Sequence, residues 1–298
     1  MARRFSARSG AGAVAAALAL FVAAGSATAA HADPAPTGPS YVALGDSRAS
    51  GPLIEASEHR DFCLHSPNAN YPAKLAAQVG ASSFTDVTCS AAKPSHVIDT
   101  PQFVGTRTAP PQLDALSPDT ELVTLSIGGG GSNHLPVSLL CAAPVPDFDG
   151  GCRDNPLAER LATEGIEKMA REVDAVVGAI VAKAPDARVY VVSHGGTVGD
   201  RACWPILPVG EQDAPWLRDY FDRFNDIYVR AAEKYDVEYI DIATAAVEGG
   251  HDGCAPTGER WFEGIVPRSP AEPAHPNELV MSAIADMIAA DYATVTSS

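Results

Sequence analysis

One serine in this chain has the setting of a nucleophile. Ser47 follows directly on a short apolar run, within Tyr41-Val42-Ala43-Leu44-Gly45-Asp46-Ser47. Such a run is typical of a buried strand, and open α/β sheets bind ligands at the carboxyl ends of their strands. A serine there becomes a nucleophile when a base reaches its hydroxyl. The Gly-Asp-Ser sequence fits an ordinary helix N-cap equally well, because Asp and Ser are both favoured caps.

A base for Ser47 would have to come from one of the eight histidines. His275 is the best placed of them, because it lies just before the last predicted helix, after the final predicted strand. A helix entry at that point falls on the same edge of the sheet as Ser47. The alternative is a histidine on a surface loop, beside a proline that starts a helix.

The elements that must position these residues alternate between strand-like and helix-like patterns. Most of the strands are nearly continuous apolar runs, which predicts a parallel sheet covered by helices on both faces. Long loops at 46–70, 89–120, 128–156, 194–214 and 244–277 gather mostly at one edge, since four of the five directly follow a strand. We expect strands at 41–45, 83–88, 121–127, 187–192 and 237–242, and helices at 71–79, 156–184, 215–235 and 278–292.

The first 32 residues have the pattern of a secretory signal peptide. Arg3, Arg4 and Arg8 precede an apolar stretch over 11–24, and small residues offer cleavage after Ala29 or Ala32. The apolar part is too short to anchor the chain in a bilayer. We expect a disordered, Pro-rich lead-in over 33–40 and a single domain over 41–298.

The charge of the mature chain limits its partners. Removing the leader takes away three of the 21 basic residues and none of the 37 acidic ones, which leaves a net charge of −19. That charge argues against nucleic acid and anionic membranes as partners. We expect an exported monomer with no membrane span and no cofactor.

Six cysteines in an oxidising compartment predict disulfides, although six allow 15 pairings. We expect neighbours in sequence to pair, as Cys63–Cys89, Cys141–Cys152 and Cys203–Cys254, because each bond would then hold a loop beside the next strand. A metal site is the weaker alternative, because no Cys-x-x-Cys motif occurs and no histidine stands at ligand spacing from a cysteine pair.

Four sequence blocks, in order, resemble those of the SGNH (GDSL) hydrolase family, in its secreted bacterial lipase and esterase branch. Gly45-Asp46-Ser47 resembles the nucleophile block, and Cys89-Ser90-Ala91-Ala92 resembles the second block, usually Cys-Ser-Gly-Ala. Thr124–Gly129 resembles the run into the third block, and Glu272–Asn277 resembles the last block, Asp-x-x-His-Pro. The spacing of the six cysteines also fits this branch.

The resemblance implies a three-layer α/β/α, flavodoxin-like fold with a five-stranded parallel sheet, and a serine esterase mechanism. Ser47 would attack an ester carbonyl, and His275 would take its proton and pass it to the leaving alcohol. Glu272 stands where the family has the aspartate that orients the histidine. Either its side chain or a nearby backbone carbonyl would serve.

The family's oxyanion hole is only partly preserved. It uses the backbone N–H of the nucleophile, here Ser47, that of the second-block glycine, here Ala91, and an asparagine side chain, here replaced by Gly130. Losing one such donor typically costs about 10²–10³ in rate. The replacements we consider are the N–H groups of Gly130 and Gly131, the amide of Asn133, and a cation from His134 or Arg48.

Two further polar residues depart from the branch. His194 follows the fourth predicted strand, where a Gly-Tyr-Pro type of turn is commoner, and could bind substrate or be merely solvated. Arg48 could hold an acidic group of the substrate or pair with a nearby carboxylate. Our leading expectation is a secreted hydrolase of small-molecule or lipid esters. The alternatives are an acyltransferase or carbohydrate deacetylase with the same site, or a pseudoenzyme that binds without turnover.

Overall fold

Five parallel strands form the central sheet. They are β1 (Gly38–Gly45), β2 (Ala81–Asp86), β5 (Leu122–Ser126), β6 (Arg188–Val192) and β7 (Glu238–Ile240). The order across the sheet is β2-β1-β5-β6-β7, and every neighbouring pair is parallel. The computed structural model describes residues 37–56 and 62–296. Its strand order is that of a flavodoxin-like sheet, which confirms the predicted fold class.

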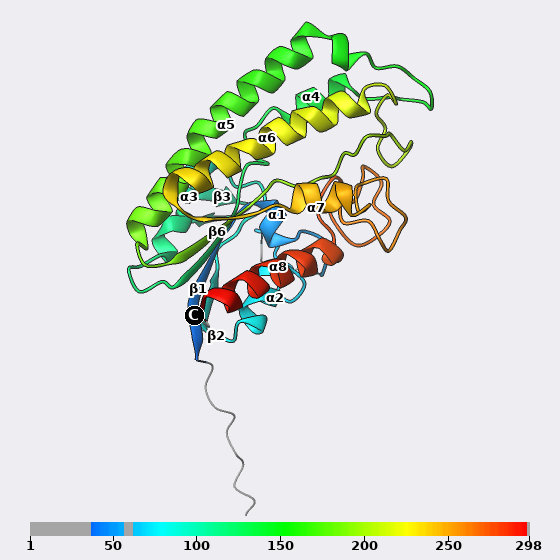
Figure 1. Cartoon of the computed structure of the whole chain (residues 1–298). Coiled ribbons are helices and arrows are strands. Elements are labelled where there is room, and N and C mark those ends of the chain that lie inside the picture. Colours follow the sequence, from blue (N-terminus) through cyan, green and yellow to red (C-terminus); the bar gives the residue numbers. More distant parts are fainter. Residues whose placement is uncertain (1–36, 57–61, 297–298) are drawn as a thin grey trace, which may run out of the picture. The chain divides into compact units, whose positions relative to one another are not determined.

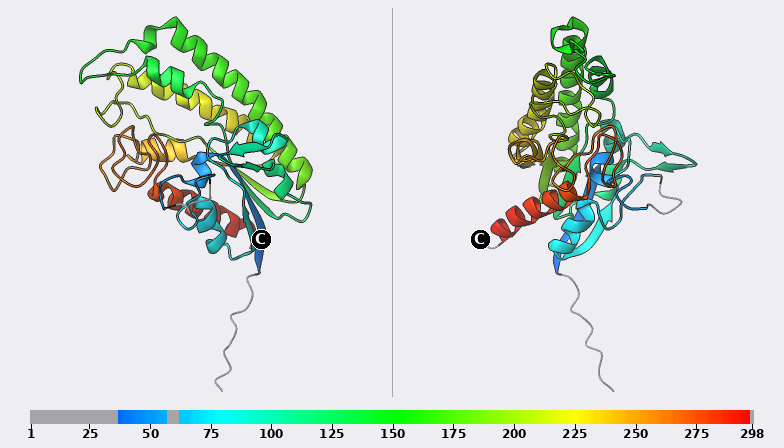
Figure 2. Two further views of the ribbon diagram at one scale, coloured as in Figure 1. Left: turned by 180° about the vertical axis from the view of Figure 1, so that it is seen from behind. Right: turned by 90° about the vertical axis from the view of Figure 1, so that its right-hand side faces the viewer.

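Helices cover both faces of the sheet (Figures 1 and 2). The long helices α5 (Pro156–Lys183) and α6 (Ala214–Tyr235) pack on one face, and α2 (Tyr71–Gln78) and α8 (Glu278–Thr296) pack on the other. Side chains alternate along a strand, so each strand serves both cores. In β1, for example, Val42 and Leu44 face α5 and α6, whereas Tyr41 and Ala43 face α2 and α8.

Local sequence signals explain where two of these helices begin. Asn70 accepts a hydrogen bond from the N–H of Ala73, and Asn155 accepts one from Leu157. Each helix also carries a proline in its first turn, where the missing N–H has no intrahelical partner to lose. These caps fix the starts of α2 and α5 at the predicted positions.

The boundaries differ from expectation at the start of the domain. The disordered lead-in expected over 33–40 is wrong for its last three residues, which belong to β1. Gly38 and Ser40 pair with Ala81 and Ser83 of β2, so their backbone groups are satisfied within the sheet. The expected signal peptide over 1–32 lies outside the described residues.

The loops expected to be irregular contain several short elements, which apolar periodicity does not indicate because each is only three to seven residues long. Figure 2 shows the β3–β4 hairpin projecting from the sheet. The elements are α1 (Ser47–Ser50), α3 (Pro94–Ile98), β3 (Gln102–Val104), β4 (Arg107–Ala109), the 3₁₀ turns Gln112–Ala115 and Cys152–Asp154, α4 (His134–Leu140) and α7 (Ile242–Glu248).

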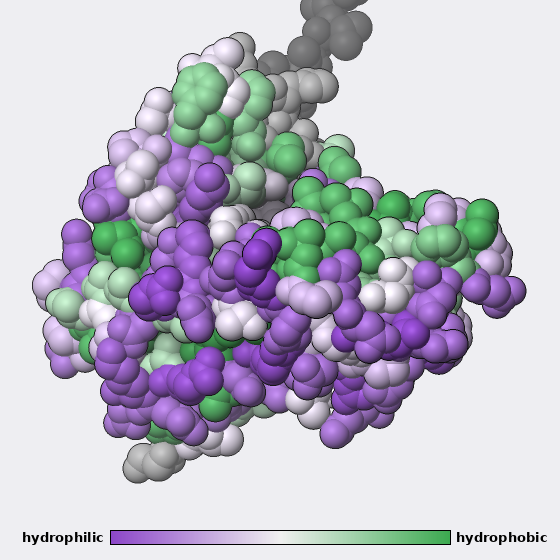
Figure 3. Space-filling model, turned by 90° about the horizontal axis from the view of Figure 1, so that it is seen from above, coloured by the Kyte–Doolittle hydropathy of each residue, from purple (hydrophilic) through white to green (hydrophobic). Residues whose placement is uncertain are grey.

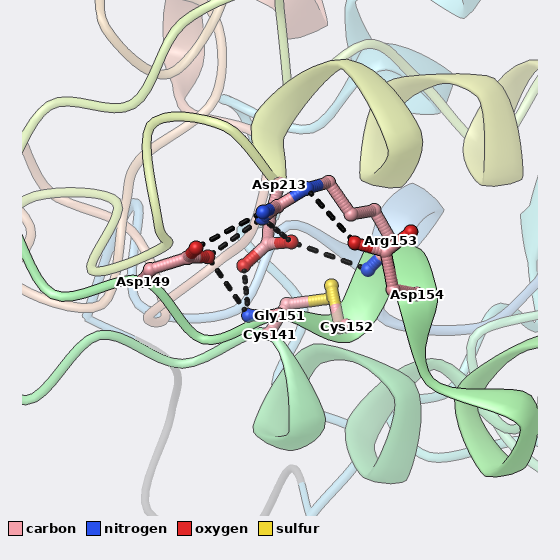
Figure 4. The surroundings of a disulfide bond; sticks show 7 residues. All are labelled: Cys141, Asp149, Gly151, Cys152, Arg153, Asp154 and Asp213. Carbon is pink, nitrogen blue, oxygen red and sulfur yellow. Dashed lines mark hydrogen bonds and ion pairs between the residues drawn. A yellow bond between two sulfur atoms is a disulfide. The ribbon is translucent and has the colours of Figure 1, made fainter.

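Three disulfides join Cys63 to Cys89, Cys141 to Cys152 and Cys203 to Cys254. Figure 4 shows the second of them beside a buried carboxylate. Asp213 has no exposed side-chain surface and accepts hydrogen bonds from the N–H of Gly151 at 2.7 Å and from Nη1 of Arg153 at 2.9 Å. This network fixes the segment between α4 and α5 against the start of α6.

Candidate active site

Ser47 is the first residue of α1, immediately beyond the end of β1. Asp46 caps the helix, because its Oδ1 accepts the N–H of Arg48 at 2.9 Å. Its Oδ2 accepts the N–H groups of Gly128 and Gly129, which follow the neighbouring strand β5, at 3.0 and 2.8 Å. The buried carboxylate therefore holds the serine turn and the glycine-rich loop together.

His275 meets Ser47 from the far end of the chain. Its Nε2 lies 2.8 Å from Ser47 Oγ, across 228 positions of sequence. Its Nδ1 lies 2.8 Å from the backbone carbonyl oxygen of Pro273. A carbonyl can only accept, so Nδ1 carries the proton and Nε2 presents its lone pair to the serine hydroxyl.

Glu272 does not orient the histidine ring. Its Oε2 lies 3.5 Å from Nε2, on the side of the ring that faces Ser47, and the Pro273 carbonyl already holds Nδ1. The expectation that the Glu272 side chain is the third catalytic group is therefore wrong for the orienting role. The alternative of a nearby backbone carbonyl describes the geometry.

The surroundings of His275 keep it neutral. Burial is the main cause that lowers the pKa of His275 to about 4, and the positive charge of Arg48 adds to it, whereas the hydrogen bond to Pro273 acts in the opposite direction. At neutral pH the ring is therefore ready to accept a proton. Burial also raises the pKa of the nearby Glu272 carboxyl.

Two backbone N–H groups that the family resemblance assigns to the oxyanion hole have no acceptor among the described residues. Within residues 37–56 and 62–296, neither the N–H of Ser47 nor that of Ala91 makes a hydrogen bond. Ala91 has a φ of 63°, the left-handed conformation that favours the family's usual glycine. The Cys63–Cys89 disulfide and a 2.8 Å hydrogen bond from Gln102 to the Ser90 carbonyl hold this turn in place.

Gly130, at the family's asparagine position, lies close against the second block. A Cβ at Gly130 would stand 2.5 Å from the carbonyl oxygen of Ala92, so no side chain fits without a backbone shift. The N–H groups of Gly130 and Gly131 have no acceptor among the described residues. Here the loop backbone occupies space that a side chain would otherwise need.

Asn133 does not replace the missing asparagine side chain. Its Nδ2 donates to the carbonyl of Leu161 in α5 at 2.8 Å, which commits the amide to helix packing. The expectation that this amide swings toward the oxyanion is therefore wrong. The sequence around Asn133 does not indicate this hydrogen bond, because its acceptor lies 28 positions later in the chain.

Arg48, His134 and His194 gather in one neighbourhood. The Arg48 guanidinium lies 5.7 Å from the centre of the Phe262 ring. The rings of His134 and His194 lie 4.5 Å apart, and His134 Nδ1 lies 2.7 Å from the Tyr220 hydroxyl. The sequence analysis did not identify Phe262 or Tyr220 as part of this neighbourhood. Phe262 lies on a loop and Tyr220 lies in α6, and neither belongs to a motif that indicates chemistry.

A hydrophobic area lies on the face formed by α4 and the segment after it (Figure 3). Leu135 and Leu139, one helical turn apart, are exposed, and so are Val145 and Phe148. Backbone contacts link this segment, loop by loop, to the turn that carries His275. They are the Ala142–Val209 bridge and the hydrogen bonds from Ile265 N–H to Ile206 and from Ala274 N–H to Gly264.

The sequence is similar to those of known lipases and esterases. Residues 43–282 match the GDSL-like Lipase/Acylhydrolase family. The chain is 35% identical over 261 residues to Lipase 2 of Streptomyces coelicolor, an alignment that covers 84% of this chain and 85% of that protein.

Solved structures are similar in fold. Phospholipase A1 from Streptomyces albidoflavus superposes with a TM-score of 0.65 at 26% identity, over 86% of this chain and 99% of that one. The extracellular lipase from Streptomyces rimosus superposes with a TM-score of 0.64 at 23% identity, over 81% of this chain and 94% of that one. The second likeness, at that identity, shows the fold alone.

Proposed function

The chain belongs to the GDSL-like Lipase/Acylhydrolase family and cleaves carboxylic esters as a serine hydrolase; we propose that Ser47 is its nucleophile and His275 its general base. The observation that carries the proposal is the 2.8 Å contact between Ser47 Oγ and His275 Nε2. The family and its named relatives favour a lipase or esterase over an acyltransferase, a carbohydrate deacetylase or a protein that binds without turnover.

His275 takes the hydroxyl proton of Ser47 on Nε2 as the serine oxygen attacks the ester carbonyl. The Pro273 carbonyl accepts a hydrogen bond from Nδ1–H throughout and stabilises the imidazolium that forms. The imidazolium then protonates the leaving alcohol. Water, deprotonated by the same nitrogen, attacks the acyl-enzyme and releases the acid and the free serine.

The negative charge of the tetrahedral intermediate needs donors in fixed positions. We assign this role to the N–H groups of Ser47 and Ala91, which have no acceptor within the described part of the chain. The N–H of Gly130 is the third donor in place of an asparagine amide. A backbone donor suits this site because Gly130 has no room for a side chain.

The substrate class in this proposal is an ester with an apolar part. Support comes from the exposed apolar side chains of α4 and the following segment, whose loops adjoin the His275 turn. We further propose that the protein works outside the cell, which fits its three disulfides. Among the described residues, no helix is both long and apolar enough to cross a membrane.

The test compares the wild type with Ser47→Ala, using a fluorophosphonate probe and 4-nitrophenyl butyrate. Ser47→Ala should lose labelling and at least about 10⁴-fold in turnover, as removal of a serine nucleophile does elsewhere. Ser95→Ala, on the exposed surface of α3, is the matched control and should behave as the wild type. Turnover that survives Ser47→Ala would contradict the assignment, and labelling of the wild type without turnover would favour a binding protein.

A further inference from the structure

Arg48 carries a charge to which no described carboxylate is hydrogen-bonded. Its Nη1 is fully buried and has no hydrogen-bond partner, and its Nη2 has only the Ala274 carbonyl at 3.5 Å. No described carboxylate forms an ion pair with it. Burial lowers the pKa of Arg48 to about 10, which still leaves the group charged at neutral pH. Asp46 attracts the guanidinium electrostatically but accepts none of its hydrogen bonds, so the buried Nη1 still lacks an acceptor, and an oxyanion would supply one.

His134 adds a second unused atom to the same neighbourhood. Its Nε2 is buried and has no hydrogen-bond partner, and its Nδ1 is taken by the Tyr220 hydroxyl at 2.7 Å. When the tyrosine donates to Nδ1, the ring proton is on Nε2 and forms an unpaired donor. Burial lowers the pKa of His134 to about 3, so the ring is neutral at neutral pH, and in the tautomer protonated on Nε2 it offers one N–H donor.

His194 connects these groups to the catalytic pair. Its ring packs against His134, and its neighbour Gly195 lies against Arg48, since a Cβ there would stand 3.4 Å from Nη1. His194 is 6% exposed, and its ring nitrogens make no hydrogen bond to any described residue. Arg48 directly follows Ser47, and its Nη2 lies 3.5 Å from the carbonyl oxygen of Ala274, the neighbour of His275, so the cluster lies beside Ser47. Burial is the main cause that lowers the pKa of His194, and the charge of Arg48 adds to it.

We propose that Arg48, His134 and His194 bind an anionic group of the ester substrate, a carboxylate or a phosphate, next to Ser47. The proposal rests on the proposed hydrolase function and names its substrate more closely. A guanidinium and neutral N–H donors are the groups that recognise an oxyanion, and the arginine supplies the charge. Asp46, the nearest acid in sequence, already receives three backbone N–H groups and makes no ion pair with the guanidinium.

The first experiment measures substrate preference. We compare kcat/KM for mono(4-nitrophenyl) glutarate with that for the neutral 4-nitrophenyl pentanoate, and kcat/KM for dihexanoylglycerol phosphate with that for dihexanoylglycerol. In the wild type at least one charged substrate should be favoured, and Arg48→Gln should lower that ratio at least tenfold, because hydrogen bonds to charged groups are worth about that much. The ratio cancels any loss common to both substrates. The arm that responds identifies carboxylate or phosphate as the ligand.

Matched variants separate binding from folding. His134→Phe keeps the aromatic packing and removes the N–H donor, so the preference should fall several-fold. Arg107→Gln removes an arginine from the exposed strand β4 and should leave the ratio unchanged. A ratio in Arg48→Gln and His134→Phe equal to that of the wild type would overturn the proposal.

The second experiment distinguishes this proposal from the hydrolase assignment. Ser47→Ala cannot turn over, yet it should bind glutarate or inorganic phosphate saturably in calorimetry, and Arg48→Gln in that background should abolish the binding. Binding without turnover in the wild type would keep the anion site and remove the hydrolase. Absence of saturable binding, with neutral esters still hydrolysed, would mean that only water occupies the cluster.

Discussion

Two arginines near the candidate active site, one buried and one partly buried, have opposite surroundings. Arg260 is 2% exposed, donates from Nη1 to Glu263 at 3.3 Å and from Nε to the Ala255 carbonyl at 3.1 Å, and Glu263 also accepts from Asn277. Arg48 has a buried nitrogen without an acceptor, and no described carboxylate is hydrogen-bonded to its guanidinium, although Asp46 attracts it electrostatically. The comparison teaches that a buried charge hydrogen-bonded to a carboxylate stabilises the fold, whereas a charge without such a bond is available to bind a ligand.

The largest expected loss of stability follows from removing the carboxylate partner of Arg260. Glu263→Gln leaves the charge of Arg260 buried without compensation, so the free energy of unfolding should fall by about 3–5 kcal/mol. Urea unfolding followed by circular dichroism measures it. A loss below about 1 kcal/mol would mean that Arg260 does not depend on its partner, and the comparison would fail.

Arg48→Met should not lower the free energy of unfolding as Glu263→Gln does. The variant keeps a long apolar stem against Phe262 and removes a charge to which no carboxylate is hydrogen-bonded, while the loss of its attraction to Asp46 offsets that gain, so the free energy of unfolding should change by less than about 1 kcal/mol. The same urea titration applies, in buffer without phosphate or carboxylates. Destabilisation as large as that of Glu263→Gln would place Arg48 in the framework instead.

The pH profile tests the same arginine through its catalytic neighbour. His275 acts as a base only when neutral, so kcat/KM should be level at neutral pH and fall as the pH drops through its pKa of about 4. Arg48→Met removes a positive charge that disfavours protonation, so the acid limb should move to higher pH. The limb should stay below pH 6.5, because burial remains the larger cause. A limb that does not move would show that the two groups are not coupled.

The smallest effect involves strain and no charge. Ala91→Gly relieves a left-handed alanine but adds chain entropy to the unfolded state, so we expect a gain of about 0.5 kcal/mol. The backbone N–H is retained, and kcat for 4-nitrophenyl butyrate should change less than twofold. Destabilisation would imply that the Ala91 methyl group packs favourably. The size of this change in the free energy of unfolding is the reference for the changes expected in Glu263→Gln and Arg48→Met.

The sheet follows from local sequence, whereas the proposed catalytic pair follows from the resemblance of its two blocks to those of the family. Apolar runs of strand length predict β1, β5 and β6. Ser47 lies just beyond the end of β1, and His275 lies just before the start of α8. The Pro273 carbonyl could not be assigned in the same way, because every residue carries a carbonyl and only the folded turn selects one. That selection is also why Glu272 fails as the orienting group.

The cluster around Arg48 marks the limit of prediction. Arg48, His134 and His194 are individually unusual in the sequence, but nothing local indicates that they meet. Their meeting depends on α4, which is too short for its periodicity to be recognised, and on its contacts with the aromatic face of α6. Asn133 is misassigned for the same reason, because its amide belongs to the α4–α5 contact.

The Asp46 carboxylate, which joins the serine turn to Gly128 and Gly129, has a mechanical consequence. Four successive glycines would ordinarily let a segment wander through many conformations. Here the first two glycines are hydrogen-bonded to Asp46, at the end of a buried strand, which restricts the conformations of the segment. A displacement of these glycines would therefore also move Asp46 and the turn that carries Ser47, so the position of the proposed nucleophile depends on this single side chain.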